Sequence, residues 1–192
     1  MKQRIRTFVA VNIDSAVRGR VAGLVDRFRA AGAEVKWVEP QNLHITLKFL
    51  GDVDAKETHR VCQAVQDAVA EVAPFEFEVR GAGAFPKADR PRTVWVGGGH
   101  GSEAMIELNR RIEAGLAKLG FRKEARRFQP HLTIGRVRRG GPALAALGKL
   151  IGEQADIELG LTKVCELVVF SSQLDRSGPT YEALARAPLG GK

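Results

Sequence analysis

Two histidines and two threonines recur in one four-residue pattern, which reads His, apolar, Thr, apolar. The pattern occurs as His44-Ile45-Thr46-Leu47 and again as His131-Leu132-Thr133-Ile134. Both copies lie in short runs typical of β-strands. Side chains of a strand alternate between its two faces, so each copy presents an imidazole and a hydroxyl on one face. If the two strands are neighbours, two His and two Thr converge on one polar site.

Such a site suits acid–base chemistry on a phosphate. Imidazole has an ordinary pKa of about 6.5, so one ring can accept a proton while the other donates one. Displacement at phosphorus needs this pair, because one group activates the entering oxygen and the other protonates the leaving oxygen. Threonine hydroxyls can donate to the non-bridging oxygens. The scheme requires no metal or cofactor, and the sequence has no H-E-x-x-H motif.

The motif pair has a plainer explanation as well. A single His in a strand is more often structural than catalytic, and H-x-T occurs by chance. The residues alone therefore leave a shared catalytic site and two structural histidines both open. The chain has four histidines in total. We expect the other two, His59 in a predicted helix and His100 in a glycine-rich turn, at the surface.

The elements that must position these residues alternate along the chain. Helices are predicted from Asp14 or Ser15, which can cap the first, from the capping-box residue Asp54, and over 105–119 and 144–151. Strands are predicted at 4–13, 36–39, both motifs (the first ending at Gly51), 75–80, 93–96, 157–159, 164–170 and 180–186, with a loop over 81–92. This order predicts an α+β fold, or an α/β fold with a largely antiparallel sheet. Residues 1–192 form one domain, and the 87 residues between the histidines hint at two similar lobes.

Composition narrows the partners. The chain of 192 residues is 44% hydrophobic and 27% charged, which is ordinary for a globular protein. Its net charge of +8 favours an anionic partner, most often nucleic acid. Cys62 and Cys165 form no framework of disulfides or metal ligands, so we interpret both as core thiols. With no secretion signal or membrane-spanning segment, we expect a cytoplasmic monomer that does not bind membranes.

At both motifs the sequence resembles the 2H phosphoesterase superfamily, named for two H-x-T/S-x motifs. Within it the sequence is most similar to the RNA 2′,3′-cyclic phosphodiesterase family, also called 2′-5′ RNA ligase. Further matching segments are residues 6–11, 42–51, 85–86 and 128–136, and the tail residues Ser172, Leu174, Gly178 and Tyr181. The one departure is Thr7, where the family usually has an apolar residue.

The resemblance implies a bilobal fold with two pseudo-symmetric lobes, mostly antiparallel sheets lining a central cleft, and helices outside. It also implies hydrolysis of a 2′,3′-cyclic phosphate on RNA or a nucleotide, leaving a 2′-phosphate. His44 would then protonate the departing O3′ as general acid, and His131 would activate water as general base. Thr46 and Thr133 would hold the phosphate.

Two further residues are candidates for substrate binding. Phe49 can stack on a nucleobase, and family similarity makes Arg136 a candidate for a phosphate or base contact. Strand alternation places both on the face opposite the motif histidines, so core packing is the alternative unless a bulge re-aims them. Basic loop residues can guide an RNA backbone or simply be solvated; these are Lys87, Arg90, Arg92, Arg122, Lys123, Arg126 and Arg127.

The sequence is compatible with two other functions. The same groups can make or break a 2′-5′ RNA linkage if a ribose 5′-hydroxyl replaces water. Alternatively, the chain can be an RNA-binding module without catalysis, although both His and both Thr are intact. The glycine-rich segments 81–83 and 97–99 fit neither a dinucleotide fingerprint nor a P-loop, so no ATP or NAD site is predicted.

Overall fold

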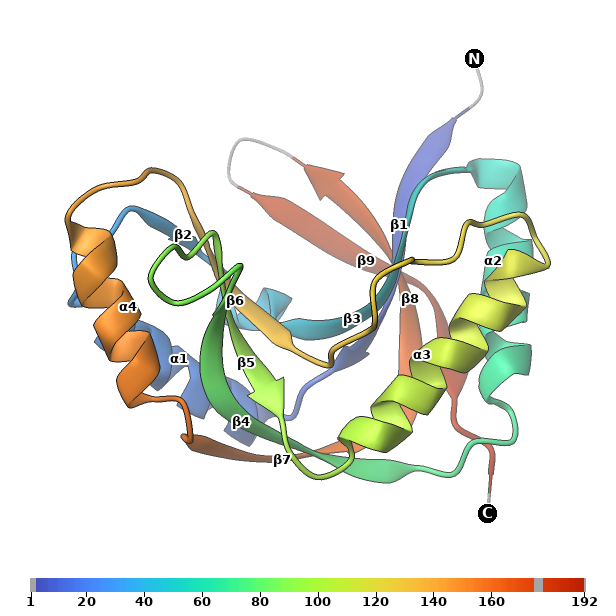
Figure 1. The fold of residues 1–192 in the computed structure, drawn as a ribbon. Helices are drawn as coiled ribbons and strands as arrows, with labels where there is room; N and C mark the ends of the chain where they lie inside the picture. The colour runs from blue at the N-terminus through green and yellow to red at the C-terminus, as the bar shows by residue number, and fades with distance from the viewer. Residues whose placement is uncertain (1–2, 175–177, 192) are drawn as a thin grey trace.

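Nine strands form one continuous sheet in which every pair of neighbours is antiparallel (Figure 1). The computed structural model describes residues 3–174 and 178–191. Within them the strands are β1 (Arg4–Asn12), β2 (Val35–Trp37), β3 (His44–Asp54), β4 (Phe75–Phe85), β5 (Thr93–Gly98), β6 (Leu132–Val137), β7 (Glu158–Val164), β8 (Glu166–Leu174) and β9 (Pro179–Pro188).

The sheet consists of two halves of four strands each, with the motif strands innermost. The order is β7-β4-β5-β6-β3-β1-β8-β9. The short strand β2 pairs with β6 along the edge that also contacts β3, opposite β5. The halves meet where β3 and β6 pair at a single position, Ile45 opposite Leu132. The predicted α+β fold with antiparallel pairing is confirmed. The two predicted sheets are joined into one, because the two motif strands themselves form a ladder.

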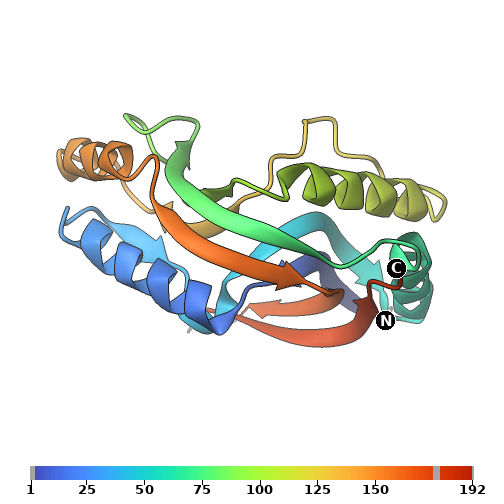
Figure 2. The same ribbon diagram turned by 90° about the horizontal axis from the view of Figure 1, so that it is seen from below.

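The described residues form four α-helices, which lie in two pairs at opposite ends of the molecule (Figures 1 and 2). At one end α1 (Ser15–Arg29) packs on β7 and α4 (Ala143–Glu153) on β4. At the other end α2 (Thr58–Val69) packs on α3 (Ser102–Ala117) and on β9. Each helix has an apolar stripe at helical spacing, which it buries against the sheet or against the neighbouring helix. No helix in the described ranges is long and apolar enough to cross a membrane.

The core lies on the face of the sheet that carries Ile45 and Leu132. These side chains are 0% and 1% exposed and belong to one cluster with the buried residues of the helices. The motif histidines, which alternate with them, therefore belong to the other face. The core thus fixes which way both motifs point.

Three sequence predictions about the elements are wrong in detail. Asp14 occupies the N-cap position of α1 as predicted, but its side chain makes no capping hydrogen bond, since its Oδ2 instead accepts one from the backbone N–H of Lys163 (3.1 Å). The first motif strand continues past Gly51 to Asp54, and β4 continues through Gly81 to Phe85. Both glycines have a positive φ, of 70° and 73°, beside shifts of register. Each forms a bulge within a strand rather than a strand end.

Candidate active site

The site begins at the one cross-strand pair between the motifs. Ile45 and Leu132 lie directly opposite each other in an antiparallel ladder. Continuing this register by one residue places His44 opposite Thr133. In the other direction it places Thr46 opposite His131. Each histidine is therefore brought beside the threonine of the other motif, on the face of the sheet that we call the histidine face.

Both imidazoles are held in the same way. Nδ1 of His44 donates to the carbonyl oxygen of Asn42, and Nδ1 of His131 donates to that of Gln129, each at 2.7 Å. A carbonyl oxygen only accepts, so Nδ1 carries the proton in both rings. This leaves Nε2 of each ring to exchange a proton with another molecule. The two rings are matched in tautomer and in anchoring.

A β-bulge follows directly after the motif threonine in β3. Thr46 is opposite Ala10 of β1, but the next two residues, Leu47 and Lys48, together oppose Val9. Leu47 and Lys48 are both buried, at 4% and 7% exposure. A bulge inserts one residue and so reverses the alternation of all that follow it.

The second motif has a bulge at the same place. Thr133 of β6 is opposite Trp95 of β5, and the next two residues, Ile134 and Gly135, together oppose Val94. Both are buried, as at the first motif. The fourth motif residue is thus the inserted one in both strands, although the two strands belong to different halves of the sheet.

These bulges decide where Phe49 and Arg136 lie. Phe49 is opposite Phe8 of β1, and its side chain is 62% exposed. Arg136 is opposite Thr93 and is also exposed. Both occupy the fifth position after their histidine and lie on the histidine face. The core-packing alternative for them is therefore wrong, because it assumed unbroken alternation.

Aromatic rings surround His44. Its ring centroid is 4.9 Å from that of Phe8, 5.3 Å from Tyr181 in an edge-on arrangement, and 6.3 Å from Phe170. Burial among these rings lowers the pKa of His44 below its ordinary value of 6.5, while the hydrogen bond to Asn42 raises it by a smaller amount. Removing water disfavours the charged imidazolium.

His131 has fewer aromatic neighbours and a cavity beside it. Its ring lies 5.2 Å from Phe85, edge-on, and 6.4 Å from Trp95. The indole of Trp95 covers Gly83, where a Cβ would come within 2.4 Å of it, so only glycine fits under this ring. Trp95 also lines a cavity of about 300 Å³ together with Gln129, whose carbonyl holds His131.

No sequence pattern predicted a role for these five aromatic residues. Alternation in β1 did place Phe8 on the face away from Val9, which was a usable signal. The others come from β4, β5, β8 and β9, whose place beside the motifs depends on pairing between distant segments. They are Phe85, Trp95, Phe170 and Tyr181.

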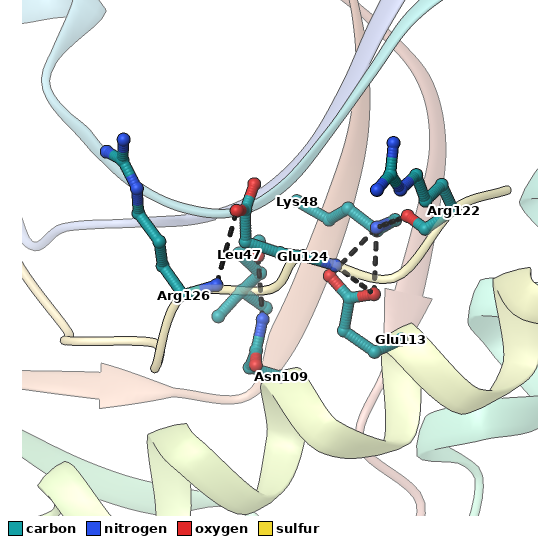
Figure 3. A network of polar contacts seen from close by, with 7 residues as sticks. All are labelled: Leu47, Lys48, Asn109, Glu113, Arg122, Glu124 and Arg126. Carbon is teal, nitrogen blue, oxygen red and sulfur yellow. Dashed lines mark hydrogen bonds and ion pairs between the residues drawn. The ribbon is translucent and has the colours of Figure 1, made fainter.

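A buried ion pair fixes β3 behind the first motif. Nζ of Lys48 lies 2.8 Å from both carboxylate oxygens of Glu113 in α3 and donates to the carbonyl of Arg122 (2.9 Å). Figure 3 shows how this network gathers α3 and the loop after it against the strand. The backbone N–H of Glu124 also donates to Glu113, at 3.3 Å, and Asn109 donates to the carbonyl of Leu47 at 2.8 Å.

This network anchors one of the two predicted basic segments. The cations of residues 122–127 are exposed and follow directly on the anchored backbone of Arg122. In the other segment, Lys87 forms an ion pair with Asp89 (2.8 Å), and Arg90 and Arg92 are exposed. His59 and His100 are exposed as predicted, whereas Cys62 is half-buried and Cys165 is exposed rather than in the core.

A second depression in the described surface is lined by none of the motif residues. It is larger, about 580 Å³, and lies between α1 and residues 152–159. Among the residues that the structure describes, no group of three or more His, Cys, Asp or Glu side chains is placed to hold a metal ion.

Known proteins resemble this chain over most of its length. Residues 15–176 match the model of the 2′-5′ RNA ligase superfamily. The chain belongs to this superfamily. It is 40% identical to the RNA 2′,3′-cyclic phosphodiesterase of Methanothermobacter thermautotrophicus, over 93% of this chain and 95% of the relative. It is 39% identical to that of Aeropyrum pernix, over 86% and 93%. The predicted family is confirmed, and with it the enzyme class, a phosphodiesterase.

Solved structures agree with the fold. TT0787 of Thermus thermophilus superposes with a TM-score of 0.79 at 26% identity, covering 97% of this chain and 99% of that one. LigT of E. coli in its apo form superposes with a TM-score of 0.75 at 22% identity, covering 96% of each chain. The second likeness supports the fold alone.

Proposed function

We propose that this protein hydrolyses 2′,3′-cyclic phosphates at the ends of RNA or of nucleotides and leaves a 2′-phosphate. The observation that carries the proposal is the Ile45–Leu132 pair, whose register brings each histidine opposite the threonine of the other motif. The activity named for the relatives in M. thermautotrophicus and A. pernix supports the same substrate class. The two halves of the sheet then act as lobes on either side of a substrate cleft.

The two rings perform opposite proton transfers. His131 takes a proton from water through Nε2, and the resulting hydroxide attacks phosphorus. His44 gives the proton on its Nε2 to the departing O3′, so the ring bond between phosphorus and O3′ breaks and the 2′-phosphate remains. The bonds from Nδ1 to the carbonyls of Asn42 and Gln129 keep each Nε2 available for these steps. The resemblance to the 2H phosphoesterase superfamily supports this assignment of His44 as the acid and His131 as the base.

The threonines and the two residues after the bulges hold the substrate. Hydroxyls of Thr46 and Thr133 donate to the non-bridging oxygens, where negative charge develops. Phe49, exposed on the histidine face, stacks on the terminal nucleobase. Arg136, exposed on the same face, contacts a phosphate or base edge.

The test uses a nucleoside 2′,3′-cyclic phosphate in buffer that contains EDTA. The wild type should release the 2′-phosphate, identified by phosphorus NMR. His44→Ala and His131→Ala should each lose about 10²–10⁴-fold in kcat, as general acid or base groups do. His100→Ala, at an exposed histidine, is the matched control. Ordinary turnover in either motif variant would refute the proposal.

A second reaction is suggested by the name of the matching family, the 2′-5′ RNA ligase superfamily. In this reaction a ribose 5′-hydroxyl replaces water as the group that His131 activates. Incubating RNA pieces with 2′,3′-cyclic and 5′-hydroxyl ends tests it: a joined product resistant to a 3′-5′-specific nuclease supports ligation. RNA affinity without any turnover would instead indicate a binding module.

A further inference from the structure

Beyond His44, the histidine face continues into a group of cationic side chains. In β1, Arg6 alternates with Phe8, whose ring contacts His44, so Arg6 is directed to the same face. In β9, Tyr181 is opposite Ser172, and its ring contacts both Phe8 (5.0 Å) and His44 (5.3 Å). Tyr181 thus lies next to the first histidine, and Arg6 lies on the same face, close enough for its charge to act on the Tyr181 hydroxyl.

Two more cations reach this place from the other half of the sheet. Arg136 of β6 is opposite Lys36 of β2, so their side chains share the histidine face. Nζ of Lys36 lies 3.8 Å from the position that a Cβ on Gly178 would occupy, just before β9. Asn42 holds this segment beside the motif by donating to the carbonyl of Pro179 (3.1 Å).

Among the described residues, no acid forms an ion pair with the cations of this group. Arg6, Lys36 and Arg136 are all exposed. Asp52 is opposite Arg6 in the ladder but forms no ion pair with it in the described structure. Burial raises the pKa of Tyr181, while the charges of Arg136 and Arg6 lower it, so both guanidinium groups act on this hydroxyl.

We propose that Arg6, Lys36, Arg136 and the hydroxyl of Tyr181 form a second phosphate subsite, which takes the phosphate on the 5′ side of the terminal nucleotide. The inference rests on the proposed function, which puts the cyclic phosphate between the two histidines. The next phosphate of an RNA strand lies one nucleoside away from the cyclic phosphate. The cationic group begins at Tyr181, whose ring is next to that of His44. Guanidinium groups and hydroxyls are common phosphate ligands.

The subsite narrows the substrate class to RNA ends, or to nucleotides that carry a 5′-phosphate. A nucleoside 2′,3′-cyclic phosphate without a 5′-phosphate fills the catalytic position alone. The wild type should therefore show a kcat/KM about tenfold higher for uridine 2′,3′-cyclic phosphate with a 5′-phosphate than without one. This preference should weaken as salt is added, since exposed cations carry it.

Variants of Arg6 and Lys36 test the subsite on these two substrates. Arg6→Gln and Lys36→Gln should each lose about fivefold to tenfold in kcat/KM on the 5′-phosphorylated substrate, and far less on the other. Tyr181→Phe should show the same selective loss, smaller in size. Arg27→Gln removes an exposed arginine of α1 that has no described ion pair, and it should alter neither rate.

Two results would overturn the subsite while leaving the proposed function intact. One is equal kcat/KM of the wild type on both substrates. The other is a loss in Arg6→Gln and Lys36→Gln that is the same for both substrates. A wild type that turns over neither substrate would instead refute the proposed function.

Discussion

The two motif strands share a backbone but differ in what surrounds it. Both place a bulge at the fourth motif residue, after Thr46 in β3 and after Thr133 in β6. The position after the insertion is Lys48 in one strand, held by a buried carboxylate, and Gly135 in the other. His44 is enclosed by three aromatic rings, whereas His131 has two such neighbours and an adjoining cavity.

The comparison distinguishes what sets the direction of each imidazole from what surrounds it. The strand, its bulge and the carbonyl bonds set the direction of the imidazole and are the same in both halves. The packing around each ring sets its electrostatics and is not the same. Similar local sequences can therefore place two histidines in different surroundings, and burial among the aromatic rings lowers the pKa of His44.

The largest effect should come from breaking the ion pair that only the first motif has. Glu113→Leu leaves the ammonium of Lys48 buried without a carboxylate, and about 3–5 kcal/mol of unfolding free energy should be lost. Urea denaturation measures it. Glu107→Leu, which removes an exposed carboxylate paired with Arg110, is the control and should lose much less. Equal losses in the two variants would show that the buried pair is not special.

At Gly135, the equivalent position in the second motif, added side-chain volume should lower stability. A Cβ at Gly135 would lie 2.7 Å from the ring of Trp37 and 2.8 Å from Val35, both side chains of β2. Gly135→Ala should therefore cost about 1–3 kcal/mol of stability by overpacking. Gly140→Ala, where nothing lies within 4 Å, should cost little in the same denaturation series. A neutral Gly135→Ala would mean that β2 moves away easily.

The residues that the bulges re-aim should affect binding more than folding. Phe49→Ala should raise KM about tenfold if each stacked base contributes about 1–3 kcal/mol. Arg136→Ala should raise KM by a similar factor and make it less sensitive to salt. Leu161→Ala, an exposed apolar residue of β7, is the control. Unchanged KM in both variants would remove these residues from the site.

The smallest effect should be a shift of the pH profile rather than a loss of rate. His44 must be protonated to act as the acid, and burial lowers its pKa below 6.5, so kcat/KM should fall with rising pH already below pH 6.5. Phe170→Ala admits water to His44 and should move this limb to higher pH. Phe85→Ala, beside His131, should leave it in place. A limb that rises with pH in this range would assign His44 as the base.

The shared face of the His and Thr in each motif could be predicted from the sequence because alternation needs only local information. Period-two patterning gave the shared face of His44 and Thr46 without knowledge of any partner strand. The bulges could not be predicted in this way. Their inserted residues are Leu47 and Ile134, which are ordinary strand formers, and a glycine (Gly135) adjoins only the second. Unbroken alternation therefore predicted the opposite face for Phe49 and Arg136.

Pairing between distant segments could not be predicted from local sequence either. The aromatic surroundings of His44 come from β1, β8 and β9, and nothing local states that these strands are neighbours. The same holds for the joining of the two predicted sheets, which depends on one ladder position, Ile45 with Leu132. Glycines predicted strand ends that do not exist, because Gly51 and Gly81 interrupt strands without ending them.

The strand order also has a consequence for how the site is completed during synthesis. The half that contains His131 is built from β4, β5, β6 and β7, which are consecutive in the chain. The half that contains His44 waits for β8 and β9, because β1 pairs with β8 across almost the whole sequence. A ribosome-bound chain can thus form the surroundings of His131 before those of His44. His44 acquires Phe170 and Tyr181, and with them its low proton affinity, only when the last hairpin closes onto β1.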